Sequence, residues 1–171
     1  MNYELIKTYI SNYGMIAIFI IVLLEYMNMP GFPAGVIMPA AGIFAAHGEF
    51  KFLHVMIVAL IAGIIGSWLL YAVGYYNGNW LLSWARKKQM KVVDKIDNLL
   101  EKLNKNEYLI LFLSKLIPTV RTLISIPAGI VKMDPIKYTL YSALGITIWN
   151  AAFIGAGYIL GEAVFKYFPF K

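Results

Sequence analysis

The chain has 171 residues, of which 60% are hydrophobic and only 14% are charged, and it carries a formal net charge of +6 without any cysteine. Soluble domains usually carry about 25% charged residues, so this composition excludes an ordinary soluble domain. The lack of cysteine excludes disulfides and thiolate metal sites. Three long stretches, 26–48, 55–85 and 138–161, hold no charged residue. Because a bilayer span takes about 20 apolar residues, we expect an all-α polytopic membrane protein.

The first apolar region leads into "LLEYMNMPGFPAGVIMPAAGIF", which is interrupted by Pro30, Gly31, Pro33 and Pro39. Each proline removes a backbone donor and clashes with the preceding turn, and in hydrocarbon the freed groups must find partners inside the protein. The stretch 13–48 is therefore predicted to be a re-entrant hairpin, followed by a transmembrane span at 53–76. Glu4 and Lys7 precede the first apolar run and no small-x-small site closes it, so we expect no cleaved signal peptide.

A polar segment follows, and it contains Arg86, Lys87, Lys88, Lys91, Lys95, Lys102 and Lys105. Between positions 92 and 103, apolar residues recur at steps of three and four, with charges on the opposite face, which is typical of an amphipathic helix. The segment 80–106 is thus predicted to be a linker helix, and the positive-inside rule places it in the cytoplasm. Its basic charge indicates topology or contact with anionic lipid, and no nucleic-acid partner is expected.

The second half of the chain repeats the pattern of the first. Pro118 and Pro127 are nine positions apart, as Pro30 and Pro39 are, and a small-residue tail follows the later proline in each half. The breakers of the second half are Pro118, Pro127 and Gly129. Interrupted hydrophobic segments at matching places in two halves point to the binding site of a transporter. Two merely kinked transmembrane helices are the alternative.

The whole chain, 1–171, is predicted to form a single membrane domain built as an inverted repeat. Repeat 1 covers about 11–78 and repeat 2 about 108–162. If the linker helix is cytoplasmic, the second re-entrant hairpin, 109–133, dips from that face and the span at 136–161 leads outward. The first hairpin then dips from the opposite face.

Three charges lie within apolar runs, and they are Glu25, Lys115 and Arg121. Ionisable groups at membrane depth are costly unless paired or hydrated, so each is a candidate for substrate binding. A guanidinium grips a phosphate with two donors, Lys115 adds a point charge, and the sum of the three charges, −1 + 2 = +1, suits a phosphate monoanion. A structural ion pair between Glu25 and Arg121 is the alternative. Asn150 and Ser67 are candidates for lining the path, although packing is the simpler interpretation of Asn150.

The same residues argue against an enzyme. Ser114 and Lys115 are adjacent, and adjacent residues do not face each other on a helix. A lipid phosphatase needs a downstream histidine nucleophile, whereas no histidine follows position 54. His47 and His54, without cysteine or spaced carboxylates, predict no metal site, and no cofactor is expected.

The chain resembles the DedA family of small bacterial membrane proteins, part of the wider VTT-domain (SNARE-associated-like) group. The resemblance runs from about Tyr13 to Gly161 and is carried by "LLEYMNMPGFPAGVIMPAAG", "GIIGSWLLYAVGYYNG", "FLSKLIPTVRTLISIPAGIVKM" and "YSALGITIWNAAFIGAGYILG". It implies paired re-entrant hairpins and a multi-pass protein of the bacterial cell (plasma) membrane that moves lipids between leaflets. Undecaprenyl phosphate and phosphatidylethanolamine are the substrates proposed for different members.

The resemblance also implies roles for individual residues. Glu25 matches the family's acid before the first hairpin, and Arg121 matches the second of two arginines around the proline of the second hairpin. Lys115 stands where the first arginine is usual, and Ser67 stands where an aspartate is frequent. The family's second acid is absent, because "PAG" at 33–35 replaces the pattern Pro-x-x-acid. With fewer titratable groups, proton coupling is less expected here.

These observations predict a flippase or scramblase for a phosphate-bearing lipid. Phosphatidylethanolamine is favoured, because its phosphate suits Arg121 and Lys115 while its ammonium suits Glu25. The alternative is a proton-coupled flippase for undecaprenyl phosphate, a polyprenyl-phosphate lipid. A second alternative is a non-transporting interaction or assembly protein that docks through the basic segment 86–105, and a third is an ion or proton transporter. A homo-oligomer is compatible with all of these readings.

Overall fold

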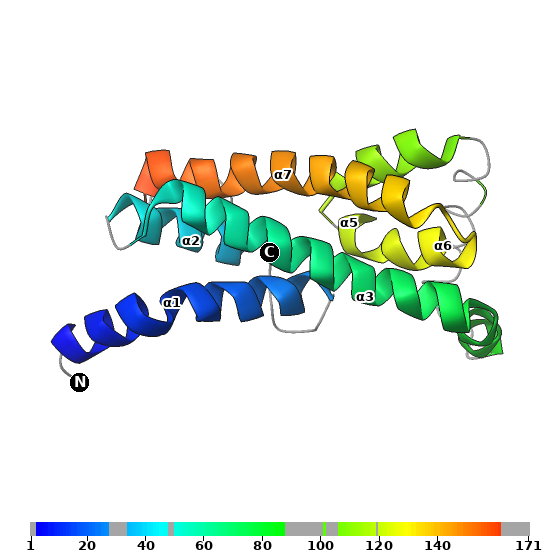
Figure 1. Ribbon diagram of the computed structural model, residues 1–171, viewed down its shortest axis with the longest axis horizontal. Coiled ribbons are helices and arrows are strands. Elements are labelled where there is room, and N and C mark those ends of the chain that lie inside the picture. Colours follow the sequence, from blue (N-terminus) through cyan, green and yellow to red (C-terminus); the bar gives the residue numbers. More distant parts are fainter. Residues whose placement is uncertain are drawn as a thin grey trace. The chain divides into compact units, whose positions relative to one another are not determined.

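A computed structural model describes residues 3–27, 34–47, 50–87, 101, 106–118 and 120–161. These residues are almost entirely helical and contain no strand, which confirms the predicted all-α class (Figure 1). Two stretches, Phe52–Gly78 and Pro135–Leu160, are long and apolar enough to cross a membrane. They overlap the spans predicted at 53–76 and 136–161.

The chain divides into two compact units. The first comprises Met1–Gly63 and Thr147–Lys171, and the second comprises Ile64–Ile146. Two long helices, α3 (Phe52–Lys87) and α7 (Pro135–Leu160), contribute residues to both units. Each unit is therefore assembled from segments that are distant in the sequence.

The first unit contains α1 (Tyr3–Tyr26), α2 (Ala34–Ala46), the beginning of α3 and the end of α7. Three predicted breakers, Pro30, Gly31 and Pro33, lie outside the described residues, between α1 and α2. Pro39, in contrast, lies inside α2, and the helix continues to Ala46. The break predicted at Pro39 is therefore absent, because one missing donor is tolerated in a helix that is packed tightly against α7.

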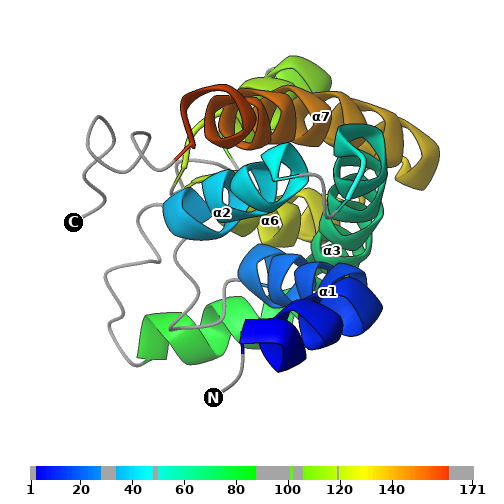
Figure 2. The ribbon, with the colours of Figure 1, turned by 90° about the vertical axis from the view of Figure 1, so that its left-hand side faces the viewer.

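That packing depends on two glycines. A Cβ added to Gly42 of α2 would collide with the backbone carbonyl of Ile154 on α7, and one added to Gly157 of α7 would collide with the carbonyl of Pro39. Figure 2 shows α2 beside the end of α7. Glycine lets the two backbones touch, as small residues do between transmembrane helices.

The second unit contains the interrupted segment that the sequence predicts around Pro118. Residues 106–115 are helical, and a tight turn follows at 116–118, in which Leu116 N donates to Leu113 O at 3.1 Å. The chain then forms two short helices, α5 (Val120–Leu123) and α6 (Ser125–Ile130). Pro127 is the third residue of α6 and does not end it, because the first N–H groups of a helix have no intrahelical partner.

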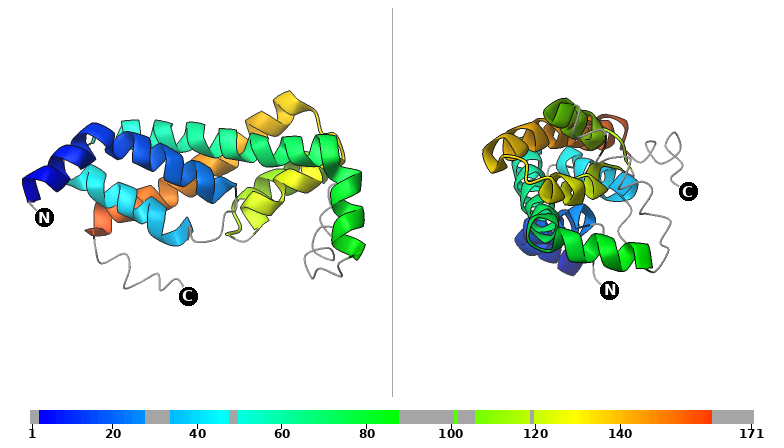
Figure 3. Two further views of the ribbon diagram at one scale, coloured as in Figure 1. Left: turned by 90° about the horizontal axis from the view of Figure 1, so that it is seen from below. Right: turned by 90° about the vertical axis from the view of Figure 1, so that its right-hand side faces the viewer.

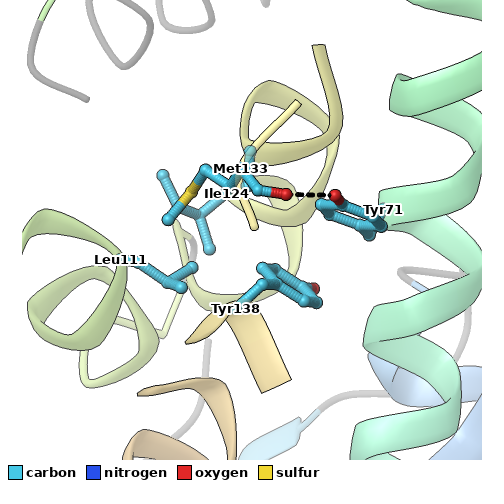
Figure 4. Close-up of a cluster of buried hydrophobic side chains, with 6 residues drawn as sticks. Tyr71, Leu111, Ile124, Met133 and Tyr138 are labelled. Atoms are coloured by element: carbon cyan, nitrogen blue, oxygen red, sulfur yellow. Dashed lines mark hydrogen bonds between the residues drawn. The ribbon is translucent and has the colours of Figure 1, made fainter. Parts of the chain in front are cut away.

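The contact between α3 and α6 repeats the one between α2 and α7. A Cβ on Gly74 of α3 would collide with the carbonyl of Ile126, and one on Gly129 of α6 would collide with the carbonyl of Tyr71. Figure 3 shows α6 lying along the second part of α3. Beside this contact lies an apolar cluster that includes Tyr71, Leu111, Ile124, Met133 and Tyr138, in which the Tyr71 hydroxyl donates to the Met133 carbonyl at 2.5 Å (Figure 4).

The ends of the two long helices have clear local causes. Asp134 caps the start of α7, because its Oδ1 accepts a hydrogen bond from Lys137 N at 2.9 Å, and Pro135 suits the first helical position. α3 continues without interruption to Lys87, with Arg86 and Lys87 in its last turn, where cations favour the helix dipole. The first eight residues of the predicted linker helix, 80–87, thus belong to α3, and 88–100 and 102–105 lie outside the described residues.

Candidate functional site

A buried lysine is the centre of a polar cluster in the second unit. Lys115 is the last residue of the helical segment 106–115 and is 1% exposed. Its Nζ donates to Ser67 Oγ at 2.9 Å and to Ser125 Oγ at 3.0 Å. The same nitrogen lies 5.8 Å from the centre of the Tyr138 ring. Residues from α3, α6 and α7 therefore surround one ammonium group.

The partners of Lys115 are themselves fixed. The Tyr138 hydroxyl donates to the backbone carbonyl of Ser67 at 3.0 Å, and its ring stacks on Tyr71 with the ring centres 4.4 Å apart. On α7, Gly145 faces the lysine stem, because a Cβ there would lie 2.5 Å from Lys115 Cβ. The helices thus hold the ammonium in one place by packing and hydrogen bonds together.

The described neighbours of Lys115 supply no negative charge. An ammonium has three donors, and within the described part of the chain Lys115 has two hydroxyl acceptors, one aromatic ring and no carboxylate. Hydroxyl oxygens satisfy its hydrogen bonds but leave its charge in place. Because a buried charge is costly unless it is paired, a nearby anion would stabilise the protonated form of Lys115.

Arg121 lies on the other side of the interruption at 116–118 and belongs to α5. It is also 1% exposed, so its guanidinium is not in bulk solvent. Its backbone N donates to Ile117 O at 2.9 Å, which closes the turn that precedes α5. The break at Pro118 therefore places two buried cations, Lys115 and Arg121, within one short segment of the second unit.

The third predicted residue, Glu25, lies in the first unit near the end of α1 and is 3% exposed. Its neighbour Tyr26 donates from its hydroxyl to Asn150 Oδ1 on α7 at 3.2 Å. Asn150 is fully buried, and its Nδ2 has no hydrogen-bond partner among the residues that the structure describes. The first unit thus contains its own buried polar group.

Sequence reasoning identified Lys115, Arg121, Glu25, Ser67 and Asn150 as candidates but missed Ser125, Tyr138 and Tyr26. A usable signal existed for Tyr138: Tyr138, Ser142 and Gly145 recur at steps of four and three along α7, so polar and small residues share one face of an apolar helix. Ser125 and Tyr26 had no comparable signal. A single serine or tyrosine in an apolar run is common, and its partner is known only from the fold.

Metal binding has no support in this part of the molecule. Among the described residues, no group of three or more histidine, aspartate or glutamate side chains lies close enough to hold a metal ion. His47 is exposed at the end of α2, and its Nδ1 donates to Ile43 O at 2.8 Å.

The helical fold, its two long apolar helices and the buried cations define a helical membrane protein with an internal polar site. The family model for the VTT domain matches residues 32–159. The chain therefore belongs to the VTT-domain family, the wider group that includes the DedA proteins. The match covers α2, α3, α5, α6 and nearly all of α7, and hence the whole Lys115 cluster.

Named relatives are bacterial. The chain is 30% identical to undecaprenyl phosphate transporter A of Staphylococcus aureus, over 94% of this chain and 80% of that protein. It is 29% identical to undecaprenyl phosphate transporter A of Bacillus subtilis, over 92% of this chain and 77% of that protein. It is also 28% identical to an alkaline phosphatase-like protein of Lactococcus lactis subsp. cremoris, over 93% and 76% respectively. No solved structure matches the chain significantly.

Two residues at which the sequence resemblance implies a departure from the DedA pattern are in direct contact. They are Lys115 and Ser67, which share the 2.9 Å hydrogen bond described above. An arginine and an aspartate can make a bidentate ion pair, whereas a serine brings no charge to a lysine.

Proposed function

We propose that this protein moves a phosphate-bearing lipid headgroup between the leaflets of the bacterial cell membrane, and that Lys115 and Arg121 receive the phosphate. The observation that carries the proposal is the buried ammonium of Lys115, which the described residues contact through neutral groups alone. In such a site no carboxylate of the described residues competes with an incoming phosphate for the ammonium. Arg121, a second buried cation in the same segment, adds donors that fit phosphate geometry.

The two serines reduce the free-energy cost of burying the ammonium when no substrate is bound. Ser67 and Ser125 satisfy two donors of Lys115 when no phosphate is present. Because hydrogen bonds to a charged group are stronger when the partner is also charged, a phosphate oxygen displaces a hydroxyl readily. When the headgroup leaves, the two serines again accept hydrogen bonds from the ammonium. Binding can thus be favourable enough for capture and weak enough for release.

Undecaprenyl phosphate is the substrate that we favour on the present findings, because two relatives carry that lipid in their names. A phosphate monoester, with up to two negative charges, suits two cations. Phosphatidylethanolamine, favoured by the sequence alone, is the second candidate.

The proposed architecture is an inverted repeat of two re-entrant hairpins. Its support is an arrangement that four helices share. In each helix, a residue whose backbone carbonyl touches a glycine of the partner helix lies three positions before a glycine of its own. The pairs are Pro39 and Gly42 on α2, Ile154 and Gly157 on α7, Tyr71 and Gly74 on α3, and Ile126 and Gly129 on α6. In each unit a short helix from one half packs on the long helix of the other half. These contacts make Pro39 equivalent to Ile126. The sequence repeat instead aligns Pro39 with Pro127, one residue further along the chain.

An enzymatic role is not part of the proposal, although one relative is named alkaline phosphatase-like. The second unit, Ile64–Ile146, contains no histidine that could become phosphorylated. We therefore expect purified protein to release no inorganic phosphate from undecaprenyl phosphate.

The test is lipid movement in proteoliposomes. Fluorescent short-chain analogues of a polyprenyl phosphate, the matching polyprenol and phosphatidylethanolamine are placed in the inner and outer leaflets, and their exposure to an impermeant quencher is followed. We expect the polyprenyl phosphate to move and the polyprenol to move no faster than in empty liposomes. Faster movement of phosphatidylethanolamine than of the polyprenyl phosphate would reverse the substrate order.

The matched variants are Arg121→Ala and Lys137→Ala, which remove one buried and one exposed cation. The first is expected to slow movement at least about tenfold, since it removes a charged hydrogen-bond donor, and the second to leave it unchanged. Normal movement by a folded Arg121→Ala protein would contradict the proposal. Movement of no lipid at all would favour the interaction or assembly role instead.

A further inference from the structure

A polar cavity lies in the second unit, and none of its lining residues belongs to the Lys115 cluster. It has a volume of about 350 Å³ and is lined by Gly74, Tyr75, Tyr76, Asn77, Gly78, Trp80, Ile130 and Lys132. These residues come from α3, where its apolar stretch ends at Gly78, and from the end of α6 and the turn after it. The cavity therefore lies at the level where the chain passes from apolar to polar.

The cavity is built into the contact between α3 and α6. Gly74 lets the two backbones touch, and a Cβ on Gly78 would lie 2.6 Å from Ile130 Cγ1. Ile130 is the last residue of α6. Beyond it α6 no longer covers α3, and the face with Tyr75, Tyr76 and Trp80 is left open.

Lys132 stands at this opening in an unusual backbone conformation. Its φ is +52°, in the left-handed region. Lys132 N donates to Gly129 O at 3.0 Å and Met133 N donates to Ala128 O at 3.1 Å, which together form a Schellman motif that ends α6. The residue at this position of the motif is usually glycine, because a side chain is strained there. A strained residue that lines a cavity suggests a function.

The polar groups of the cavity suit a phosphate on an amphipathic molecule. Lys132 Nζ lies 5.6 Å from the Tyr75 ring centre, and the described residues include no carboxylate paired with it. The nearby acid in the sequence, Asp134, already accepts the hydrogen bond that caps α7. Asn77 adds an amide, while Tyr76 and Trp80 are 80% and 65% exposed. Exposed tyrosine and tryptophan are typical of the level of lipid headgroups.

We propose that this cavity binds the phosphate headgroup of a membrane lipid at the membrane surface, with Lys132 and Asn77 on the phosphate and Tyr76 and Trp80 against the first part of the lipid chain. It would be a loading site, separate from the Lys115 cluster, where the headgroup waits before it moves inward. The inference rests on the proposed function, because a transporter of such a lipid must first collect it. It assigns a second binding site to the same class of substrate.

The experiment is photo-crosslinking with farnesyl phosphate that carries a diazirine near the headgroup, applied to the full chain in detergent and followed by peptide mass spectrometry. The key variant is Lys132→Gly, which removes the ammonium and relieves the left-handed backbone, so its thermal midpoint should equal or exceed that of the wild type. The control is Lys137→Ala, because a glycine at this position would itself destabilise α7. Lys137 likewise places its Nζ 5.1 Å from a tyrosine ring, that of Tyr108, but does not line the cavity.

We expect wild-type crosslinks within 74–80 or 130–132, an at least about tenfold loss in Lys132→Gly, as for removal of one charged hydrogen bond, and no loss in Lys137→Ala. Unlabelled farnesyl phosphate should compete, whereas farnesol and inorganic phosphate should not. Competition by farnesol would overturn the phosphate assignment, and equal competition by inorganic phosphate would overturn the lipid assignment.

The outcome is separable from that of the transport proposal. Lipid movement by the wild type without crosslinks in this cavity would overturn the loading site alone. Crosslinks that depend on Lys132, in a protein that moves no lipid, would support the site while contradicting transport.

Discussion

At the scale of single residues, Lys115 shows how an amino group can be held in an apolar interior by hydroxyl and aromatic partners. Its two serine partners provide hydrogen bonds, and the Tyr138 ring provides a weaker electrostatic contact. Hydrogen bonds to charged groups contribute about 1.5–3 kcal/mol each, which offsets part of the desolvation cost. The residual cost is what an anionic substrate can relieve.

The serine partners are expected to matter for stability. Ser125→Ala removes one acceptor of the buried ammonium and should lower the free energy of unfolding by about 1–3 kcal/mol. Ser83→Ala, at an exposed position on α3, should change it by less than about 0.5 kcal/mol. Chemical denaturation of the two variants in the same detergent measures the difference. Equal stability of both variants would argue against the serine as a partner of Lys115.

The candidate residues were predictable to the extent that they break a compositional rule. Lys115 and Arg121 are charged residues in an apolar run, so the sequence alone indicates that they are candidates for a functional role. Ser125 breaks no rule, and its role follows only from the turn at 116–118, which brings α6 back beside the lysine. A hydroxyl partner is selected by the fold, and no local pattern encodes it.

At the scale of helices, glycine positions decide which elements touch. Gly157 and Gly155 are two residues apart on α7, yet a Cβ would collide with the Pro39 carbonyl at the first and meet nothing within 4 Å at the second. α6 has only 6 residues and α2 has 13, and isolated helices of such lengths are at best marginally stable. We therefore expect both to depend on these backbone contacts with α3 and α7.

The two α7 glycines give a matched pair of substitutions. Gly157→Ala should destabilise the protein by about 1–3 kcal/mol through overpacking. Gly155→Ala should be neutral or stabilising by up to about 1 kcal/mol, because alanine is the better helix former. Thermal unfolding in detergent compares them. A Gly157→Ala protein as stable as Gly155→Ala would contradict the close contact between α2 and α7.

The helices also show where local rules mislead. The break at Pro118 is present, because a turn at 116–118 interrupts the helix there. Pro39 and Pro127 look equivalent in the sequence, yet both lie inside helices. Tertiary packing overrides the proline at position 39, and the start of α6 tolerates the one at position 127. Likewise, the sequence predicts a separate linker helix that begins at position 80, whereas α3 continues to Lys87.

At the scale of the whole molecule, α3 and α7 each contribute to both compact units. The sequence repeat predicts two halves that follow each other along the chain. The compact units divide each long helix between them, which no periodicity could reveal, because the division depends on contacts between residues far apart in the sequence. The matching glycine contacts support the proposed repeat.

The proposed inverted topology makes a prediction about which face of the membrane each end of a span reaches. The chain has no cysteine, so single cysteines at the exposed positions Lys51 and Lys137 can be labelled without interference. We expect an impermeant maleimide to label Lys51→Cys in intact cells and Lys137→Cys only after permeabilisation. Labelling of both from the same side would contradict an inverted repeat with one span between them.

The central claim is that an uncompensated buried charge at Lys115 captures the lipid phosphate. The most direct measurement is the rate of polyprenyl-phosphate movement in proteoliposomes with wild type, Lys115→Met and Lys115→Arg, each shown to be folded by its thermal midpoint. We predict that Lys115→Met is at least as stable as the wild type but at least about tenfold slower, while Lys115→Arg retains more movement than Lys115→Met. A folded Lys115→Met protein that moves the lipid at the wild-type rate would contradict the account.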